Sequence, residues 1–168
     1  QHLAIFFSDL KGSTFLYRRM GDAEAYQLVR EHFTAIFSAV EKHGGAAVKT
    51  IGDGVMGTFF NSADALRGIA ACMHSLDELN RRAGLYGEDR LRLKVGLHVG
   101  PCIVVTLNHR LDYFGSTVNI ASRLSNLAEG NDLVMSEHVL HDGTTAEVVQ
   151  AFGSLESMQV SLRGLDGF

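Results

Sequence analysis

The sequence predicts a single α+β domain, and three observations lead to this expectation. The 168 residues fit one domain, and 46% of them are hydrophobic, which is enough for a sizeable core. Short apolar runs typical of strands alternate with long segments whose apolar residues recur at helical spacing. No internal repeat, linker or low-complexity segment divides the chain. We therefore expect one domain over residues 1–168.

The N-terminal part predicts a strand followed by a short and a long helix. Residues 3–8 are dense in apolar side chains and predict a buried strand. A short helix follows as far as residue 20, with Ser13 or Thr14 as a suitable N-cap. Residues 23–43 have apolar side chains at helical spacing, and Gly44-Gly45 ends this helix.

The central part predicts a hairpin, a second long helix and further strands. Residues 46–51 and 55–60 are strand-like, and the Asp-Gly pair in Gly52-Asp53-Gly54 between them favours a hairpin turn. Asn61 or Ser62 caps a helix that runs to about residue 83. Residues 91–106 favour strands, with interruptions at Gly96 and at Gly100-Pro101.

The C-terminal part predicts a third helix and more strands. Residues 113–114 form a short edge before Gly115, residues 117–129 a helix, and residues 133–135 a strand. From residue 146 onward the weak alternation favours further strands. The expected architecture is a ferredoxin-like βαββαβ core sheet with helices on one face and additional C-terminal strands.

Charge and composition exclude several classes of function. The net charge is −4 and the charged residues are scattered, so we expect no nucleic-acid binding through a basic surface. No apolar run approaches the roughly 20 residues that span a bilayer, and no signal-peptide pattern is present. Cys72 and Cys102 are expected as reduced thiols, and the protein is expected to be cytoplasmic. Because the chain opens at Gln1 rather than Met, we expect it to be part of a longer protein with regulatory domains elsewhere.

The first of three segments with unusual polar residues is Phe7–Thr14. Asp9 ends the apolar strand and is followed by a glycine-containing turn into a helix. A carboxylate in that position can hold a hard cation, and the free backbone N–H groups of the turn can hold phosphate oxygens. Solvation of a strand end explains Asp9 equally well when this segment is taken alone.

The other two segments carry polar residues on the hairpin and on the third helix. Taken alone, Asp53 is explained by turn geometry and Lys49 by an exposed strand face. Asn119 and Arg123 lie four residues apart and share a helix face. Asn is a poor residue for a helix interior, so its position one turn from an arginine favours a function, although a solvated face remains the other interpretation.

Taken together, the three segments resemble the catalytic domain of class III adenylyl and guanylyl cyclases. The resemblance covers residues 3–165. It includes Lys49-Thr50-Ile51-Gly52-Asp53-Gly54, then Gly96-Leu97-His98-Val99-Gly100, then the stretch from Gly115 to Arg123. Each motif is moderately specific, and their order and spacing together make a chance match very improbable.

The resemblance implies a role for each polar residue. Asp9 and Asp53 match the family's ligands for two divalent metal ions, Mg²⁺ or Mn²⁺, and the Leu10 carbonyl adds a further ligand. The remaining matches are Lys49 and Asp112 for the purine, Asn119 for the ribose, Arg123 for the transition state, and the N–H groups of Gly12, Ser13 and Thr14 for the phosphates.

The resemblance also implies an activity and an assembly. Guanylyl cyclases of the family usually carry Glu and Cys at the positions of Lys49 and Asp112, so this chain is expected to convert ATP to 3′,5′-cyclic AMP and pyrophosphate. In the family each site lies between two chains, which implies a homodimer with two shared sites. Some members place a lysine on the terminal phosphates; here Leu165 stands at that position and Arg163 is the nearest cation.

Other functions fit the sequence less well. A catalytically silent, nucleotide-binding signalling domain usually lacks one or more of the six side chains that are intact here, and guanylate cyclase remains a further alternative. A diguanylate cyclase would need a Gly-Gly-Asp/Glu-Glu-Phe signature, which Gly44-Gly45-Ala46-Ala47 is not. An RNA-recognition sheet would need exposed aromatics on its central strands. The eight histidines show no metal-ligand spacing, and His98 is expected to be structural.

Overall fold

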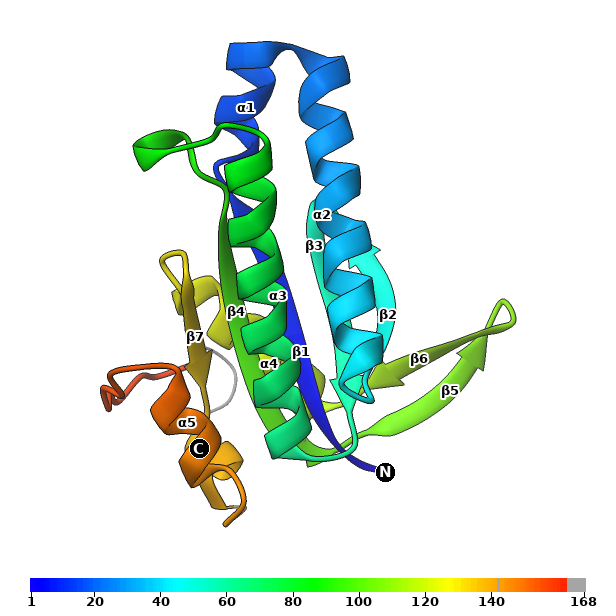
Figure 1. Ribbon diagram of the computed structural model, residues 1–168. Coiled ribbons are helices and arrows are strands. Elements are labelled where there is room, and N and C mark those ends of the chain that lie inside the picture. Colours follow the sequence, from blue (N-terminus) through cyan, green and yellow to red (C-terminus); the bar gives the residue numbers. More distant parts are fainter. Residues whose placement is uncertain (142, 163–168) are drawn as a thin grey trace.

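A computed structural model describes residues 1–141 and 143–162 of the protein (Figure 1). The elements are, in chain order, β1 (His2–Lys11), α1 (Ser13–Met20), α2 (Asp22–Lys42), β2 (Ala46–Ile51), β3 (Gly54–Phe59), α3 (Ser62–Arg82), η1 (Gly87–Asp89), β4 (Arg92–Pro101), β5 (Ile103–Leu107), β6 (Arg110–Phe114), α4 (Ser116–Leu127), β7 (Asp132–Met135), η2 (Glu137–His141) and α5 (Ala146–Ala151). Arg163 and Leu165 lie outside the described residues.

The main sheet has five strands in the order β2-β3-β1-β4-β7. The β2-β3, β3-β1 and β1-β4 pairs are antiparallel, and β7 pairs with β4 in parallel. The segment from β1 to β4 is the βαββαβ unit that the sequence predicts, with its four strands in ferredoxin-like order. The α+β class is therefore confirmed.

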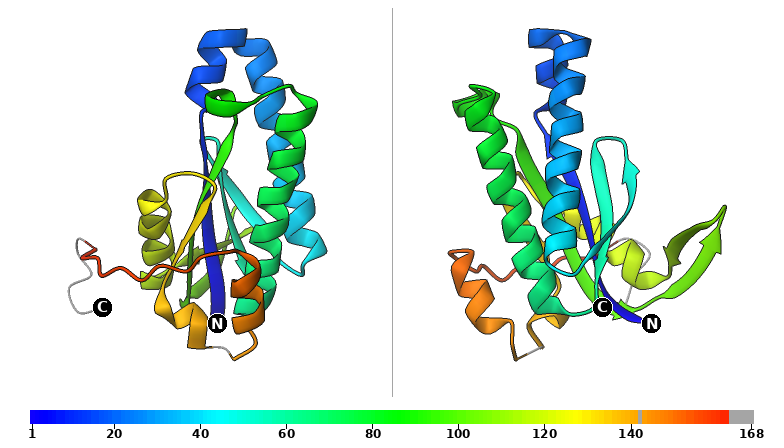
Figure 2. Two further views of the ribbon diagram at one scale, coloured as in Figure 1. Left: turned by 60° about the vertical axis from the view of Figure 1, so that its left-hand side comes forward. Right: turned by 45° about the vertical axis from the view of Figure 1, so that its right-hand side comes forward.

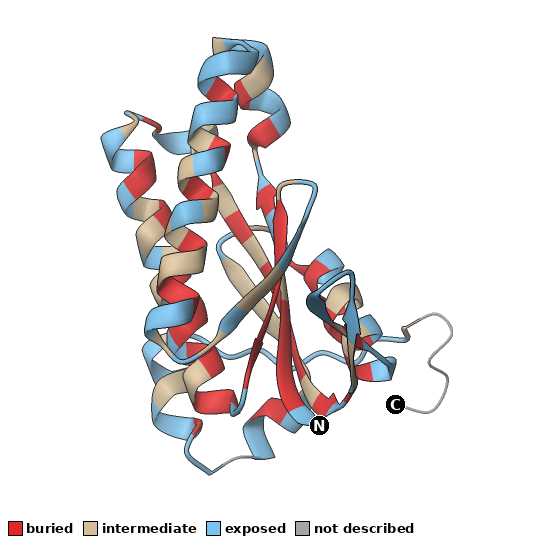
Figure 3. Cartoon of the chain, turned by 90° about the vertical axis from the view of Figure 1, so that its right-hand side faces the viewer, coloured by how far each residue is buried: buried red, intermediate tan, exposed pale blue. Residues whose placement is uncertain are grey.

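Helices cover both faces of this sheet (Figure 3). The two long helices α2 and α3 pack together on one face, as expected for the core unit. Helix α4, which follows the core unit in the chain, packs on β4 and β1 from the other side, and the sequence analysis did not anticipate a helix on that face. Alternate residues of β1 serve the two layers: Ala4 and Phe6 join the α2–α3 core, and Ile5 joins the α4 side. A strand that is buried on both faces has a continuous run of apolar residues, which is the pattern of residues 3–7.

The β5–β6 hairpin extends away from the rest of the domain (Figure 2). Its turn residues Asn108 and His109 have positive φ, which suits a tight two-residue turn. The large apolar side chains that it exposes are about half or more accessible: Ile103 65%, Leu107 50%, Leu111 56% and Phe114 47%. Large apolar groups gathered on one protruding hairpin favour an interaction surface.

The C-terminal part differs from the sequence prediction. Residues 146–162 contain no strand; α5 is followed by coil as far as residue 162. Val148 and Phe152 lie four residues apart and, with Val149, pack against the core on the α2–α3 side. Packing of these three side chains against the core outweighs the weak alternation of the sequence. Within the described residues, no helix is both long and apolar enough to span a membrane.

Candidate active site

Two aspartates come together at one end of the sheet: Asp9 lies near the end of β1, and Asp53 lies at the tip of the β2–β3 hairpin. Ile51 and Gly54 pair across a two-residue turn, and Gly52, the first residue of that turn, has a φ of 60°. A side chain at Gly54 would collide with the backbone carbonyl of Ser8, so glycine allows the hairpin to approach β1. The hydroxyl of Ser13 donates a hydrogen bond to Asp53, which fixes the hairpin tip against α1.

The carboxyls of Asp9 and Asp53 are electrostatically linked. The side chain of Asp9 reaches solvent, but surrounding protein atoms desolvate it and raise its pKa above the ordinary value. The neighbouring carboxyl of Asp53 raises the pKa of Asp9 further, whereas the backbone N–H of Leu10 and the charge of Lys94 lower it. Two neighbouring carboxyl groups form an oxygen-rich position suited to a divalent cation.

A cavity of about 550 Å³ opens beside Asp9. Its lining contains Asp9, Leu10, Gly12, Ser13 and Thr14 together with Lys11, Lys94, Ala128 and Glu129. Five of the residues predicted to hold metal or phosphate therefore share one cavity.

The turn before α1 gives this cavity its free N–H groups. Gly12 has a φ of 102° and is the N-cap of α1, so the prediction of Ser13 or Thr14 as the cap is wrong. The reason is that glycine adopts the left-handed conformation readily, which leaves the Ser13 hydroxyl to bond Asp53. The first N–H groups of a helix have no partner within the helix and attract anions.

Lys94 is a residue of this cavity that the sequence analysis missed. It lies directly opposite Asp9 in the β1–β4 ladder and lines the cavity. The side chain of Lys11, the other lysine there, donates to the Glu129 carbonyl at 2.7 Å, whereas the side chain of Lys94 has no hydrogen bond or ion pair with any residue that the structure describes. The available signal was a lone cation within the apolar stretch Leu93 to Leu97.

The predicted purine-binding residues contact each other. Lys49 of β2 donates to both carboxylate oxygens of Asp112 of β6, at 2.7 and 2.8 Å. The hydrogen bond from Lys49 is the main cause that lowers the pKa of Asp112, and the Tyr113 N–H contributes in the same direction. Asp112 is therefore ionised at neutral pH and positioned as a hydrogen-bond acceptor.

Asn119 and Arg123 lie one turn apart on α4. Asn119 is exposed and Arg123 is partly buried. Neither lines the cavity beside Asp9, and Arg123 forms no ion pair within residues 1–141 and 143–162. The predicted site residues thus form three groups within one chain: the Asp9 cavity with Asp53, the Lys49–Asp112 pair, and the Asn119 and Arg123 side chains.

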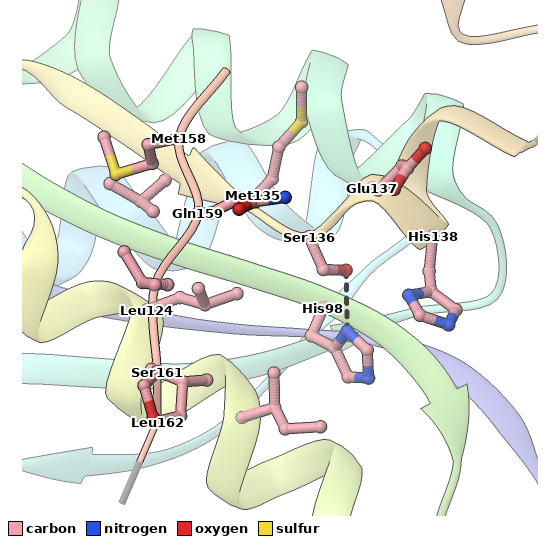
Figure 4. Close-up of a pocket in the computed structure, with 13 residues that line it drawn as sticks. His98, Leu124, Met135, Ser136, Glu137, His138, Met158, Gln159, Ser161 and Leu162 are labelled. Atoms are coloured by element: carbon pink, nitrogen blue, oxygen red, sulfur yellow. Dashed lines mark hydrogen bonds between the residues drawn. The ribbon is translucent and has the colours of Figure 1, made fainter. Parts of the chain in front are cut away.

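A second cavity, of about 600 Å³, contains none of the predicted site residues (Figure 4). It lies between α4, β7 and the segment 158–162. His98 lines it from β4, is buried as its apolar neighbours predict, and pairs through Nδ1 with the Ser136 hydroxyl at 2.6 Å. Burial, and to a smaller extent electrostatic repulsion from the His138 and His2 rings, lower the pKa of His98 to about 4, so its ring is neutral at physiological pH.

The described residues hold no cluster of three or more His, Cys, Asp or Glu side chains arranged for a metal. The pair formed by Asp9 and Asp53 is thus the candidate metal position, and it offers two carboxylates. Mg²⁺ is commonly bound by one or two carboxylates together with substrate phosphates, so two carboxylates beside a cavity lined by the start of α1 fit such an ion.

Known proteins resemble this chain over most of its length. An adenylate cyclase of Anabaena cylindrica is 27% identical over 154 residues, covering 84% of this chain and 31% of the relative. Guanylate cyclase 2G of Rattus norvegicus is 30% identical over 158 residues, covering 89% of this chain and 14% of the relative. This chain therefore spans less than a third of either relative, and the two relatives differ in the purine that they are named for.

The fold and the family agree. A solved structure of an adenylate cyclase from Trypanosoma brucei in its monomeric state has a TM-score of 0.73 at 22% identity, covering 89% of this chain and 79% of that one. Residues 1–165 match the family described as the adenylate and guanylate cyclase catalytic domain. The matched family, the shared fold and the clustered aspartates lead to one assignment: the chain belongs to the adenylate and guanylate cyclase catalytic domain family.

Proposed function

We propose that the protein is an adenylate cyclase that converts ATP to 3′,5′-cyclic AMP and pyrophosphate at sites shared between two chains of a homodimer. The observation that carries the proposal is the Lys49–Asp112 pair, because it provides a donor and an ionised acceptor suited to adenine. The aspartate pair beside a cavity with free helix N–H groups supports binding of a metal-bound triphosphate.

Asp9 and Asp53 would hold two divalent ions, Mg²⁺ or Mn²⁺, with the Leu10 carbonyl as a further ligand. Bound there, the ions would lower the pKa of the ribose 3′-hydroxyl and neutralise charge on the phosphates. The hydroxyl of Ser13 keeps Asp53 oriented toward the same position by its hydrogen bond. Ordering the carboxylates before the substrate arrives reduces the reorganisation that the reaction requires.

The remaining residues bind and orient the nucleotide. The N–H groups of Gly12, Ser13 and Thr14 bind phosphate oxygens, and Lys94 adds a positive charge to the same cavity. Asn119 orients the ribose so that the 3′-hydroxyl attacks the α-phosphorus in line with the departing pyrophosphate. Arg123 stabilises the charge that develops on the α-phosphate.

Purine choice follows from hydrogen-bond polarity. Adenine offers an N–H donor at N6 and an acceptor at N1, which match Asp112 and Lys49. Lysine has three donors and a carboxylate has about four acceptor positions, so the two side chains can keep their ion pair while each contacts the base. Guanine reverses both groups and would leave two mismatched polar partners, a form of mismatch that binding sites reject strongly.

Sharing of the site between two chains is supported by two features. The Asn119 and Arg123 side chains do not line the cavity beside Asp9 of their own chain. The β5–β6 hairpin exposes Ile103, Leu107, Leu111 and Phe114, which a second copy would cover. In a two-fold dimer each chain would supply Asp9 and Asp53 to one site and Asn119 and Arg123 to the other. The greater length of the relatives supports regulatory domains elsewhere in the full-length protein.

Product analysis tests the proposed activity. The purified protein is incubated with equal concentrations of ATP and GTP in the presence of Mn²⁺, and the products are separated by chromatography. We expect cyclic AMP to be the dominant product. Nucleotide binding without any cyclic product would support the silent signalling domain instead, and equal rates of cyclic AMP and cyclic GMP formation would refute the roles given to Lys49 and Asp112.

Changing both purine-binding residues should erode the preference for ATP. Lys49→Glu combined with Asp112→Cys reverses the donor and acceptor at these positions, so the ratio of kcat/KM for ATP to that for GTP should fall by at least about tenfold, which corresponds to one hydrogen-bond mismatch of about 1.4 kcal/mol. Lys42→Glu, at an exposed position near the end of α2, is the matched control and should leave the ratio unchanged. An unaltered ratio in the double variant would contradict the assignment.

A further inference from the structure

Helix α4 lies directly against the backbone of β4 because Gly96 has no side chain. A Cβ at Gly96 would lie 2.8 Å from the backbone carbonyl carbon of Leu124, and closer still to the Ser125 amide nitrogen and the Ala121 carbonyl oxygen. All three atoms belong to the backbone of α4, which cannot rotate away as a side chain can. Gly96 therefore sets how closely the helix approaches the sheet.

The first turn of α4 is tied to the end of the same strand. The buried Thr117 hydroxyl donates to the Pro101 carbonyl at 2.5 Å. A Cβ at Gly100 would lie 2.7 Å from the Thr117 hydroxyl oxygen, so a second glycine of β4 leaves room for this tie. Strand β4 therefore contacts α4 at two places, through Pro101 at Thr117 and through Gly96 at the turn from Ala121 to Ser125. Asn119 and Arg123 lie within this part of the helix.

We propose that Gly96 and Thr117 are positioning residues that set the height of Asn119 and Arg123 above the sheet. This inference rests on the proposed function, in which these two side chains complete the site of the partner chain. Arg123 lies between Ala121 and Ser125, whose backbone atoms a Gly96 side chain would displace. A displacement of the helix is therefore transmitted to the arginine that acts on the α-phosphate.

The effect should be confined to one half of the catalytic residues. A side chain at Gly96 would point toward α4, whereas Asp9 lies near the end of β1 and Asp53 at the tip of the β2–β3 hairpin. The hydrogen bond from Ser13 holds Asp53 independently of α4. Gly96→Ala should thus damage what a chain gives to its partner's site and spare its own metal-binding residues.

Turnover by the single variants is the first measurement. Gly96→Ala should lower kcat by about 10²-fold, the size expected when a catalytic group moves by about 1 Å. Gly68→Ala is the matched control, because its Cβ would crowd the Phe59 ring on the α2–α3 side instead. Folded Gly68→Ala should keep its turnover. Full activity of Gly96→Ala would overturn the inference.

Subunit mixing identifies the damaged half. Gly96→Ala exchanged with Asp9→Ala should recover roughly a quarter of wild-type activity. In each mixed dimer, one site takes its aspartates from the Gly96→Ala chain and its α4 residues from the Asp9→Ala chain, and both are unaltered there. Gly96→Ala exchanged with Arg123→Ala should recover no activity, because neither chain supplies a functional α4 to its partner's site. Recovery in neither mixture would mean a general structural defect, and recovery in both would mean that α4 is intact; either result overturns the inference.

Two controls separate failure of this inference from failure of the proposed function. The wild-type protein and the mixture of Asp9→Ala with Arg123→Ala are measured in the same experiment. If either is inactive, the result contradicts the proposed function and not the role of Gly96. If Gly96→Ala does not fold, Thr117→Val replaces it, since valine keeps the shape and removes the bond to Pro101. Thr117→Val should lower kcat several-fold and follow the same mixing pattern, with Thr117→Ser restoring activity. Unchanged kcat in Thr117→Val would overturn the inference.

Discussion

Asp9→Ala and Asp53→Ala should each lower kcat for cyclic AMP formation by about 10³-fold or more. Loss of a metal ligand removes several kcal/mol of transition-state stabilisation, and each 1.36 kcal/mol corresponds to a factor of ten in rate. Initial rates are measured over a titration with Mn²⁺, in which the high-affinity phase should disappear.

The fold should survive both substitutions. Asp9 is an exposed residue near the end of β1 and Asp53 lies in the β2–β3 turn, and partial burial and the neighbouring Asp53 carboxyl together raise the pKa of Asp9 above its ordinary value. Thermal unfolding of the metal-free variants should therefore show no large loss of stability. Asp22→Ala, at an exposed position in the first turn of α2, is the control and should retain turnover. Retained activity in both site variants would remove the two-metal mechanism.

Arg123→Ala should lower kcat by about 10²–10³-fold, the usual consequence of removing a group that stabilises charge in the transition state. The apparent affinity for Mn²⁺ should change little, because the metal-binding aspartates lie on other elements. Arg30→Ala, an exposed arginine of α2, should behave as wild type. A variant that loses affinity for ATP but keeps its kcat would show that Arg123 binds the substrate without acting on the transition state.

Much of the fold could be predicted from the sequence because its signals are local. Residues 46–51 form β2 as expected, and Asn61 caps α3 by accepting from the Asp64 N–H at 2.8 Å. The side of the sheet that α4 covers could not be predicted, since periodicity identifies an apolar helix face but not the layer against which it packs. The C-terminal segment was also mispredicted, because only tertiary packing of Val148 and Phe152 separates a short helix from a strand there.

The candidate site could be predicted where it depends on sequence motifs. The resemblance led to Asp9 and its neighbours, and the structure gathers the residues from Asp9 to Thr14 around one cavity. Lys94 was missed because its position opposite Asp9 depends on the register between β1 and β4, which are far apart in sequence. The tie between Ser13 and Asp53 was missed for the same reason, since it joins α1 to a distant hairpin.

Mixing two inactive variants tests most directly the claim that two chains build each site. Asp9→Ala and Arg123→Ala are combined in equal amounts and allowed to exchange subunits, and cyclic AMP formation is measured. About half of the dimers should then be mixed, and each mixed dimer has one site with both residues intact, so activity should return to roughly a quarter of the wild-type value. No recovery, despite demonstrated exchange, would contradict the account, because each site would then be completed within one chain.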